Sequence, residues 1–289
     1  MLAFAHPDAE VVALTTVNGN VPISKTTTNA CTILDVLGAD VPVYAGCSRP
    51  LIAAPHFAYE FHGKDGLGDS GYPPSMRAVA DEHAVHALIR LANEAPGELT
   101  LVAIGPLTNV AMAVRLDPAL PSKYKSLVAM GGAIRGMGNA TTAAEFNFYA
   151  DPEAVAIVCE AWPELTLVSW ETTMAHGVSP EQLDVLMTTA TPRGEFYRRT
   201  SVNTVAYLER ALGNKIMFEP DLLAVAAAIE PDIVTQAEIH AVQIELAGQH
   251  TRGQSTVDWW NRSGQTPNVH LVLEMDRERL WALMRMMVS

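Results

Sequence analysis

Short runs of apolar, β-branched residues alternate with segments of helical periodicity over the first two thirds of the chain. The apolar runs lie at residues 10–17, 41–46, 99–105, 126–132 and 165–170, and the helical segments at residues 26–38, 83–95, 107–116 and 151–162. Continuous apolar strands are typical of a parallel sheet that helices cover on both faces. The pattern therefore predicts an α/β fold with a doubly wound, mostly parallel sheet and flanking helices.

The last third of the chain has a different pattern. Helix-prone stretches at residues 179–189, 193–213 and 220–229 precede two β-like runs at residues 240–248 and 268–276. We expect the three helix-prone stretches to form a helical cap region and the two β-like runs to add an edge to the sheet. No internal repeat or low-complexity linker interrupts the pattern, so we expect a single domain over residues 1–289.

Composition narrows the classes of partner. The net charge of −13 and pI near 5.1 argue against a nucleic-acid or anionic-membrane surface, because both require clustered Lys and Arg. A small neutral or cationic ligand fits this charge better. No basic N-terminal region and no apolar run of membrane-spanning length occurs, so we expect neither a signal peptide nor a membrane span.

The cysteines indicate the compartment. Cys31, Cys47 and Cys159 are odd in number and have no C-x-x-C spacing. They therefore predict neither a disulfide framework nor a zinc site, and a cytoplasmic location is the simplest expectation.

Candidate chemistry is expected at the carboxyl ends of the strands, where ligands bind in open α/β sheets. The longest polar segment there is "GGAIRGMGNATTAAEFN" at residues 131–147, and connections of this length in compact domains are usually functional or disordered. Its Glu145 lies between Asn139 and Asn147, and carboxylate and carboxamide groups suit the hydroxyls of a sugar. The alternative is that Asp151 caps a helix and the rest is solvated loop.

The other polar loops are less specific. "NGN" at residues 18–20 is a common turn sequence, and "HGKDGLGD" at residues 62–69 can be a surface loop despite its imidazole and carboxylates. "GPLTN" at residues 105–109 can be a strand-to-helix connection that Thr108 or Asn109 caps. Asp221 can be the N-cap of the helix that follows it, or it can aim its carboxylate at a ligand. No nucleophile elbow, Walker loop, dinucleotide fingerprint or H-E-x-x-H motif is present.

Taken in order, these segments resemble the inosine-uridine-preferring nucleoside hydrolases. The resemblance runs from about His6 to the C-terminal strands and is carried by "HPDAEVVALTTVNGN", "VPVYAG", "HGKDGLGD", "VAIGPLTNVAMAVRLDP", "VAMGGAIRGMGNATTAAEFNFYADPEAV" and "PDLLAVAAAIEPDIV". It implies a doubly wound α/β fold and hydrolysis of the N-glycosidic bond of purine or pyrimidine ribonucleosides. It also implies a calcium cofactor, a small-molecule ribonucleoside as the partner, and a homodimer or homotetramer.

The resemblance also implies roles for individual residues. The implied substrate-binding residues are Asn20, His62, Met130, Asn139, Glu145, Asn147 and Asp221. Asn20 and Asn139 would hold ribose hydroxyls. Glu145 and Asn147 of the "EFN" motif at residues 145–147 would bind the ribose end, and Met130 would line the sugar pocket. His62 would lie near the base or its departing nitrogen. The calcium ligands would be the carboxylate of Asp221 and the backbone carbonyl of Ile104.

Two departures from the family pattern change these expectations. Many members carry a His as leaving-group acid where this chain has Pro220, so the acid and the preferred base stay open. The family begins with a strand that ends in the acidic cluster D-x-D-x-G-x-D-D, which supplies most calcium ligands and the catalytic base. In this chain residues 1–5 match the helix after that cluster.

We therefore expect the 289-residue chain to bind calcium poorly and the neighbours of the absent strand to keep unpaired edges. Two explanations are open: the encoded protein starts further upstream, or the chain is a catalytically inactive nucleoside- or ribose-binding remnant. The sequence favours the first, because the other ribose-binding positions are all present.

Overall fold

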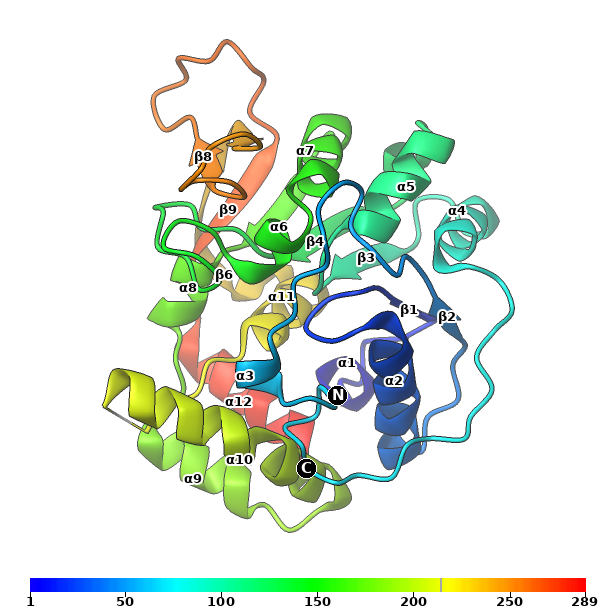
Figure 1. Ribbon diagram of the computed structural model, residues 1–289, viewed down its shortest axis with the longest axis vertical. Coiled ribbons are helices and arrows are strands. Elements are labelled where there is room, and N and C mark those ends of the chain that lie inside the picture. The colour runs from blue at the N-terminus through cyan, green and yellow to red at the C-terminus, as the bar shows by residue number, and fades with distance from the viewer. Residues whose placement is uncertain (214) are drawn as a thin grey trace.

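The computed structural model describes residues 1–213 and 215–289, and its centre is a five-stranded sheet (Figure 1). The strand order is β3 (Thr100–Ala103), β4 (Ser126–Met130), β5 (Leu165–Val168), β9 (Val269–Met275) and β6 (Val234–His240). The first four strands are parallel, and β6 pairs antiparallel with β9. The predicted mostly parallel sheet is confirmed.

Helices cover both faces of this sheet. On one face α4 (Ala84–Glu94), α5 (Thr108–Leu116) and α7 (Pro152–Ala161) enclose a core that includes Leu127 and Ala129 of β4. On the other face α1 (Leu2–Ala5), α11 (Pro220–Ile229) and α12 (Arg277–Val288) enclose a core that includes Val128 and Met130. Because side chains alternate across a strand, this division of β4 confirms the doubly wound fold.

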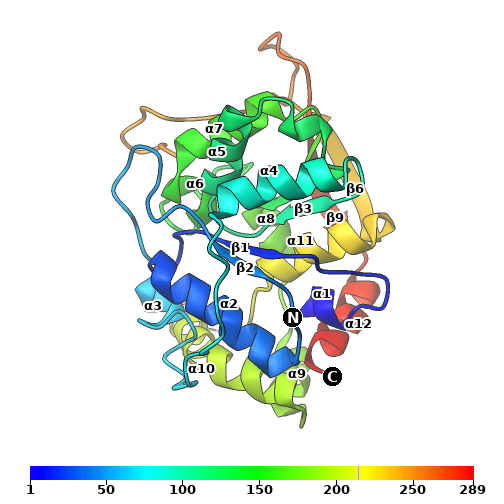
Figure 2. The ribbon, with the colours of Figure 1, turned by 90° about the vertical axis from the view of Figure 1, so that its right-hand side faces the viewer.

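A second, smaller sheet lies beside β3. It consists of β1 (Leu14–Thr16) and β2 (Val43–Ala45), which pair in parallel (Figure 2). Within the part of the chain that the structure describes, β1 pairs only with β2 and β3 only with β4, so each keeps one edge without a strand partner. These are the unpaired edges that the sequence predicts.

The side chain of Asn109 connects the start of α5, which follows β3, with the carboxyl ends of the small sheet. Asn109 of α5 donates from Nδ2 to the carbonyl of Thr16 (2.8 Å) and accepts at Oδ1 from the N–H of Cys47 (2.8 Å). The carboxamide therefore bonds with β1 and with the segment that follows β2 rather than capping its own helix. The prediction of a Thr or Asn cap at this position is wrong, and the loops of the two sheets converge as a result.

The remaining helices lie below the sheets in Figure 1 or close their loops. The bounds are α2 (Ile23–Leu37), α3 (Tyr59–His62), α6 (Phe146–Ala150), α8 (Trp170–Ala175), α9 (Pro180–Thr188) and α10 (Pro192–Leu212), with short 3-10 helices at Leu120–Ser122 and Pro231–Ile233. The long α10 contacts α2, α3, α9 and α12, which confirms the predicted helical cap. No helix in the described part of the chain is long and apolar enough to cross a membrane.

The C-terminal strands differ from the sequence prediction. The run at residues 268–276 forms β9, which lies between β5 and β6 rather than at an edge. Both faces of β9 are buried, with Leu271 on one face and Val272 on the other, as an interior strand requires. The run at residues 240–248 forms β7 (Val242–Ile244), which pairs with β8 (Ser255–Val257) outside the main sheet.

Candidate functional site

Glu145 is a buried carboxylate with a fixed orientation. It occupies the N-cap of α6, where Oε1 accepts the N–H of Asn147 (2.9 Å) and Oε2 accepts the N–H groups of Gly132 (2.9 Å) and Phe148 (3.2 Å). Burial raises the pKa of Glu145 to about 7, although these amide bonds act in the opposite direction. The carboxylate is therefore held in one direction at the carboxyl end of β4.

Asn147, Met130 and Asn139 lie around this carboxylate. The Asn147 amide donates from Nδ2 to the carbonyl of Met130 (3.1 Å) and lies 3.3 Å from its sulfur. Asn139 is exposed, and its Oδ1 accepts the N–H of Phe146 (2.8 Å), the residue after Glu145. The structure thus brings together four of the predicted sugar-binding residues.

Asp221 lies in the first turn of α11 and does not cap it. The N-cap is Glu219, and α11 has no side-chain capping bond, so the N-cap interpretation of Asp221 is wrong. Solvent reaches the Asp221 carboxylate, yet the surrounding protein crowds it. Desolvation, and then the charges of Glu219 and Glu145, raise the pKa of Asp221 to about 7. We call these three acids, Glu145, Glu219 and Asp221, the carboxylate site.

The third member, Glu219, was not predicted as a binding residue from the sequence. Its Oε1 accepts a hydrogen bond from the hydroxyl of Tyr197 on α10 (2.7 Å), and burial raises the pKa of Glu219 to about 7. Tyr197 is itself buried, although two arginines, Arg198 and Arg199, follow it directly. In the sequence, Glu219 stands between Phe218 and Pro220, and nothing in this local pattern indicates Tyr197 as its partner.

His62 ends α3 and packs its ring against Phe61, with ring centroids 4.9 Å apart. Desolvation lowers the pKa of His62 to about 4. The neutral form of the imidazole is therefore favoured at pH 7, and in that form the ring can both donate and accept a hydrogen bond.

Residues 62–71 form a segment of successive turns that we call the glycine loop. Asp69 Oδ1 accepts the N–H groups of Lys64 (2.7 Å) and Asp65 (3.1 Å). Asp65 Oδ1 accepts the N–H groups of Leu67 (2.7 Å) and Asp69 (2.9 Å). Both carboxylates hold the backbone of their own loop.

Asn20 and Ile104 complete the predicted set. The carbonyl of Asn20 accepts the N–H of Ala58 (2.9 Å), which joins the loop after β1 to the start of α3. Ile104 directly follows β3, and its side chain is exposed. Within the described part of the chain, Asn20, His62 and Ile104 form no hydrogen bond with Glu145 or Asp221.

Asp151 caps a helix, as the alternative interpretation of the sequence predicted, but the loop before it is not simply solvated, because Ile134 and Glu145 are buried. It caps α7 by accepting the N–H of Ala154, and it is fully buried. Its Oδ2 also accepts the hydroxyl of Thr108 (2.6 Å) and the N–H of Leu51 (3.0 Å). Asp151 is therefore structural, whereas the carboxylate site lies on the preceding loop and on α11.

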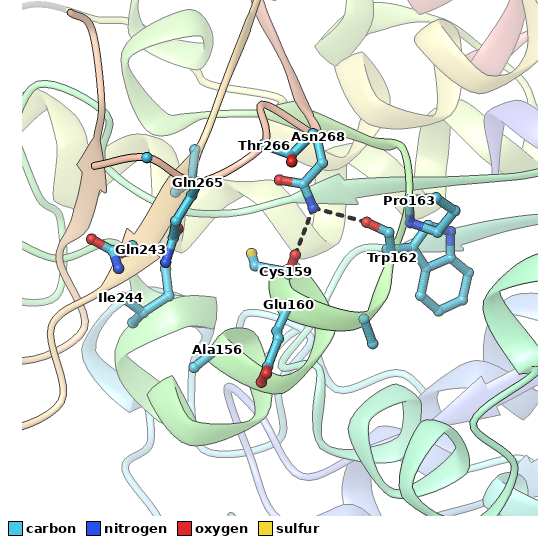
Figure 3. Close-up of a pocket in the computed structure, with 13 residues that line it drawn as sticks. Ala156, Cys159, Glu160, Trp162, Pro163, Gln243, Ile244, Gln265, Thr266 and Asn268 are labelled. Atoms are coloured by element: carbon cyan, nitrogen blue, oxygen red, sulfur yellow. Dashed lines mark hydrogen bonds between the residues drawn. The ribbon is translucent and has the colours of Figure 1, made fainter. Parts of the chain in front are cut away.

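Two cavities lie away from these residues. One of about 780 Å³ lies between α7, β7 and residues 264–268, where Asn268 donates to the carbonyls of Cys159 (2.7 Å) and Trp162 (2.8 Å) (Figure 3). Another of about 510 Å³ lies beside α3 and includes Glu60 and Tyr207. None of the predicted site residues lines either cavity.

Comparison with known proteins shows the family of the chain. The family model described as inosine-uridine preferring nucleoside hydrolase matches residues 1–282. The inosine-uridine preferring nucleoside hydrolase of Crithidia fasciculata is 35% identical over 289 aligned residues, which cover 98% of this chain and 90% of that protein.

Solved structures have the same fold. A plant nucleoside hydrolase superposes with a TM-score of 0.92 at 31% identity and covers 100% of this chain and 93% of its own. An inosine-guanosine nucleoside hydrolase gives a TM-score of 0.91 at 32% identity, with 99% and 93% covered. With a family match over almost its whole length, this chain belongs to the inosine-uridine preferring nucleoside hydrolase family.

Proposed function

We propose that this chain hydrolyses the N-glycosidic bond of purine or pyrimidine ribonucleosides to ribose and free base. The observation that carries the proposal is the convergence of Glu145, Asn147 and Asp221 at the carboxyl ends of the sheet strands. Family membership supports the same reaction class. The names of the relatives cover inosine, uridine and guanosine, so the preferred base of this chain stays open.

In this proposal the chain's own residues bind and orient the ribose. Glu145 presents a carboxylate that three backbone N–H groups hold, so it can accept hydrogen bonds from ribose hydroxyls without reorganising. Asn139 and Asn147 add carboxamides beside it, and Asp221 adds a second carboxylate that solvent can reach. Negative charge on these acids favours the oxocarbenium-like transition state of glycosidic cleavage.

A calcium ion supplies an activated water in the reaction that the resemblance implies, and the described residues do not fit that ion. Calcium takes about 6–8 oxygen ligands. Among residues 1–213 and 215–289, no group of three or more His, Cys, Asp or Glu is placed to hold a metal. Asp221 and the carbonyl of Ile104 leave such a site short of ligands, so the group that activates water stays unassigned.

The second candidate function is a nucleoside- or ribose-binding protein without catalysis. Both candidates predict ribose affinity through Glu145 and Asn147. A cytoplasmic location, expected from the cysteine pattern, and a homodimeric or homotetrameric state, implied by the family resemblance, are further parts of the proposal.

The test is release of free base and ribose from inosine, uridine and guanosine, measured with added calcium and again with a chelator. Release that stops with the chelator supports a metal-dependent hydrolase. Ribose binding without release supports the second candidate, and absence of both contradicts the proposed function.

A further inference from the structure

The segment between β4 and α6, residues 131–145, is held by a carboxylate from another element. Glu171, in the first turn of α8, accepts the N–H groups of Ile134 (2.9 Å), Arg135 (2.7 Å) and Met137 (3.3 Å). Oε2 takes the first of these bonds and Oε1 takes the other two. Both carboxylate oxygens of Glu171 are thus used on one short stretch of a loop that lies far away in sequence.

The main chain alone provides little to fix this stretch. Within residues 133–137, the N–H of Gly136 donates to the carbonyl of Ala133 at 3.4 Å, which is long for a hydrogen bond. Hydrogen bonds to an ionised carboxylate are about twice as strong as neutral ones. Burial of the Ile134 side chain in the core anchors one end of this stretch, and Glu171 provides most of the hydrogen bonds that hold the backbone of residues 134–137.

The second half of the segment is folded against the start of α6. Asn139 accepts the N–H of Phe146, and Thr141 accepts the N–H groups of Ala143 (3.2 Å) and Ala144 (3.0 Å). Gly138 joins the two halves, where a Cβ atom would lie 2.4 Å from backbone atoms of Ala144. The connection to Asn139 is thus short and tightly packed, so a displacement of Met137 is passed on to Asn139.

We infer that Glu171 is a positioning residue for ribose binding: by holding residues 134–137 it sets the place of Asn139 beside Glu145. This inference rests on the proposed function, because it takes Asn139 and Glu145 as ribose ligands. Glu171 does not touch the sugar and acts only through the loop. Its alternative role is to stabilise the N-terminus of α8 through the helix dipole, as an acid in the first turn does.

Three variants separate these roles. Glu171→Ala removes all three acceptor bonds, and Glu171→Gln keeps one acceptor oxygen. The matched control is Glu245→Ala, because the Glu245 carboxylate also accepts two backbone N–H groups, those of Ala247 (2.8 Å) and Gly248 (2.9 Å), in a loop that carries no predicted ligand.

The measurements are ribose and inosine affinity by calorimetry, KM and kcat where turnover is present, and amide hydrogen exchange of residues 133–139. We expect Glu171→Ala to weaken ribose affinity or raise KM about tenfold, with kcat within about twofold and faster exchange in this segment. Glu171→Gln should recover part of both effects. Glu245→Ala should lower stability without changing affinity.

The failures are distinguishable. A wild-type chain that binds neither ribose nor inosine contradicts the proposed function itself, and with it the ribose role of Glu171. A wild-type chain that binds ribose while Glu171→Ala and Glu171→Gln bind it equally well contradicts the positioning role alone. Equal loss of affinity in Glu171→Ala and Glu245→Ala also overturns it, because the effect would then follow stability rather than the loop.

Discussion

The glycine loop and the carboxylate site are both rich in acids, but Asp65 and Asp69 of the loop have different partners from Asp221 of the site. In the glycine loop, Asp65 and Asp69 each accept two backbone N–H groups of the same loop. In the carboxylate site, Asp221 has no capping bond, is open to solvent and lies near two other acids. Sequence alone makes the two regions look alike.

The difference teaches that the partners of a carboxylate, rather than its presence in a loop, indicate its role. Asp65 and Asp69 accept only backbone donors of their own loop among the hydrogen bonds described above, so they stabilise that turn, at about 0.5–1.5 kcal/mol net for each hydrogen bond. A carboxylate close to other acids, such as Asp221, has a raised pKa, because its charged form is desolvated and repelled by its neighbours and this lowers the stability of the fold. Such a cost is typical of functional sites.

The largest expected effect comes from Asp221. Asp221→Asn keeps the shape of the side chain and removes its charge, so we expect kcat/KM for ribonucleosides to fall by about 10²–10³. Stability at pH 8 should not fall, because the variant removes repulsion with Glu145 and Glu219. Steady-state kinetics and urea unfolding check both parts. Asp232→Asn, beyond the other end of α11, is the control and should leave activity unchanged.

Glu145 should give the next largest effect. Glu145→Gln turns an amide NH₂ toward backbone donors, so we expect ribose affinity to fall about tenfold or more and stability to fall by about 1–3 kcal/mol. Calorimetry and chemical unfolding measure the two quantities. Unchanged ribose affinity in a folded Glu145→Gln protein would remove Glu145 from the site.

Asp69 should behave in the opposite way to Asp221. Asp69→Ala leaves the N–H groups of Lys64 and Asp65 without their acceptor, so stability should fall by about 1–2 kcal/mol. We expect ribose affinity to stay within about threefold of the wild type. Thermal unfolding together with calorimetry checks this, and a selective loss of affinity would mean that the glycine loop has a direct binding role.

The smallest effect is a pH dependence from His62. Its pKa of about 4 in the folded protein lies below the ordinary value of 6.5, so between these pH values the unfolded chain binds a proton that the folded chain does not. Stability should therefore fall as pH decreases from about 6.5 to about 4 through this residue. His62→Gln should remove that part of the slope in urea titrations, and an unchanged slope would assign it to other groups.

The sequence predicted most of the fold because apolar periodicity reports burial directly. The strands and helices up to residue 170 lie where the pattern placed them, and the unpaired edges of β1 and β3 were expected. The pattern could not order the C-terminal strands, because an apolar run indicates burial without indicating its neighbours. β9 was therefore predicted at an edge although it lies inside the sheet.

The site was predicted in part for the same reason. Asn139, Glu145 and Asn147 are close in sequence, so one loop brings them together. Glu219 and Glu171 act through partners on other elements, Tyr197 on α10 and residues 134–137 after β4. Such contacts depend on the packing of distant segments, and no local motif marks them.

The most direct test of the comparison is one calorimetric titration of ribose into the wild type, Asp221→Asn and Asp69→Ala. We predict that the wild type and Asp69→Ala bind ribose with affinities within about threefold, while Asp221→Asn loses at least about 1.4 kcal/mol of binding free energy, which is a tenfold weaker affinity. Loss of ribose binding in Asp69→Ala together with full binding in Asp221→Asn would contradict the account.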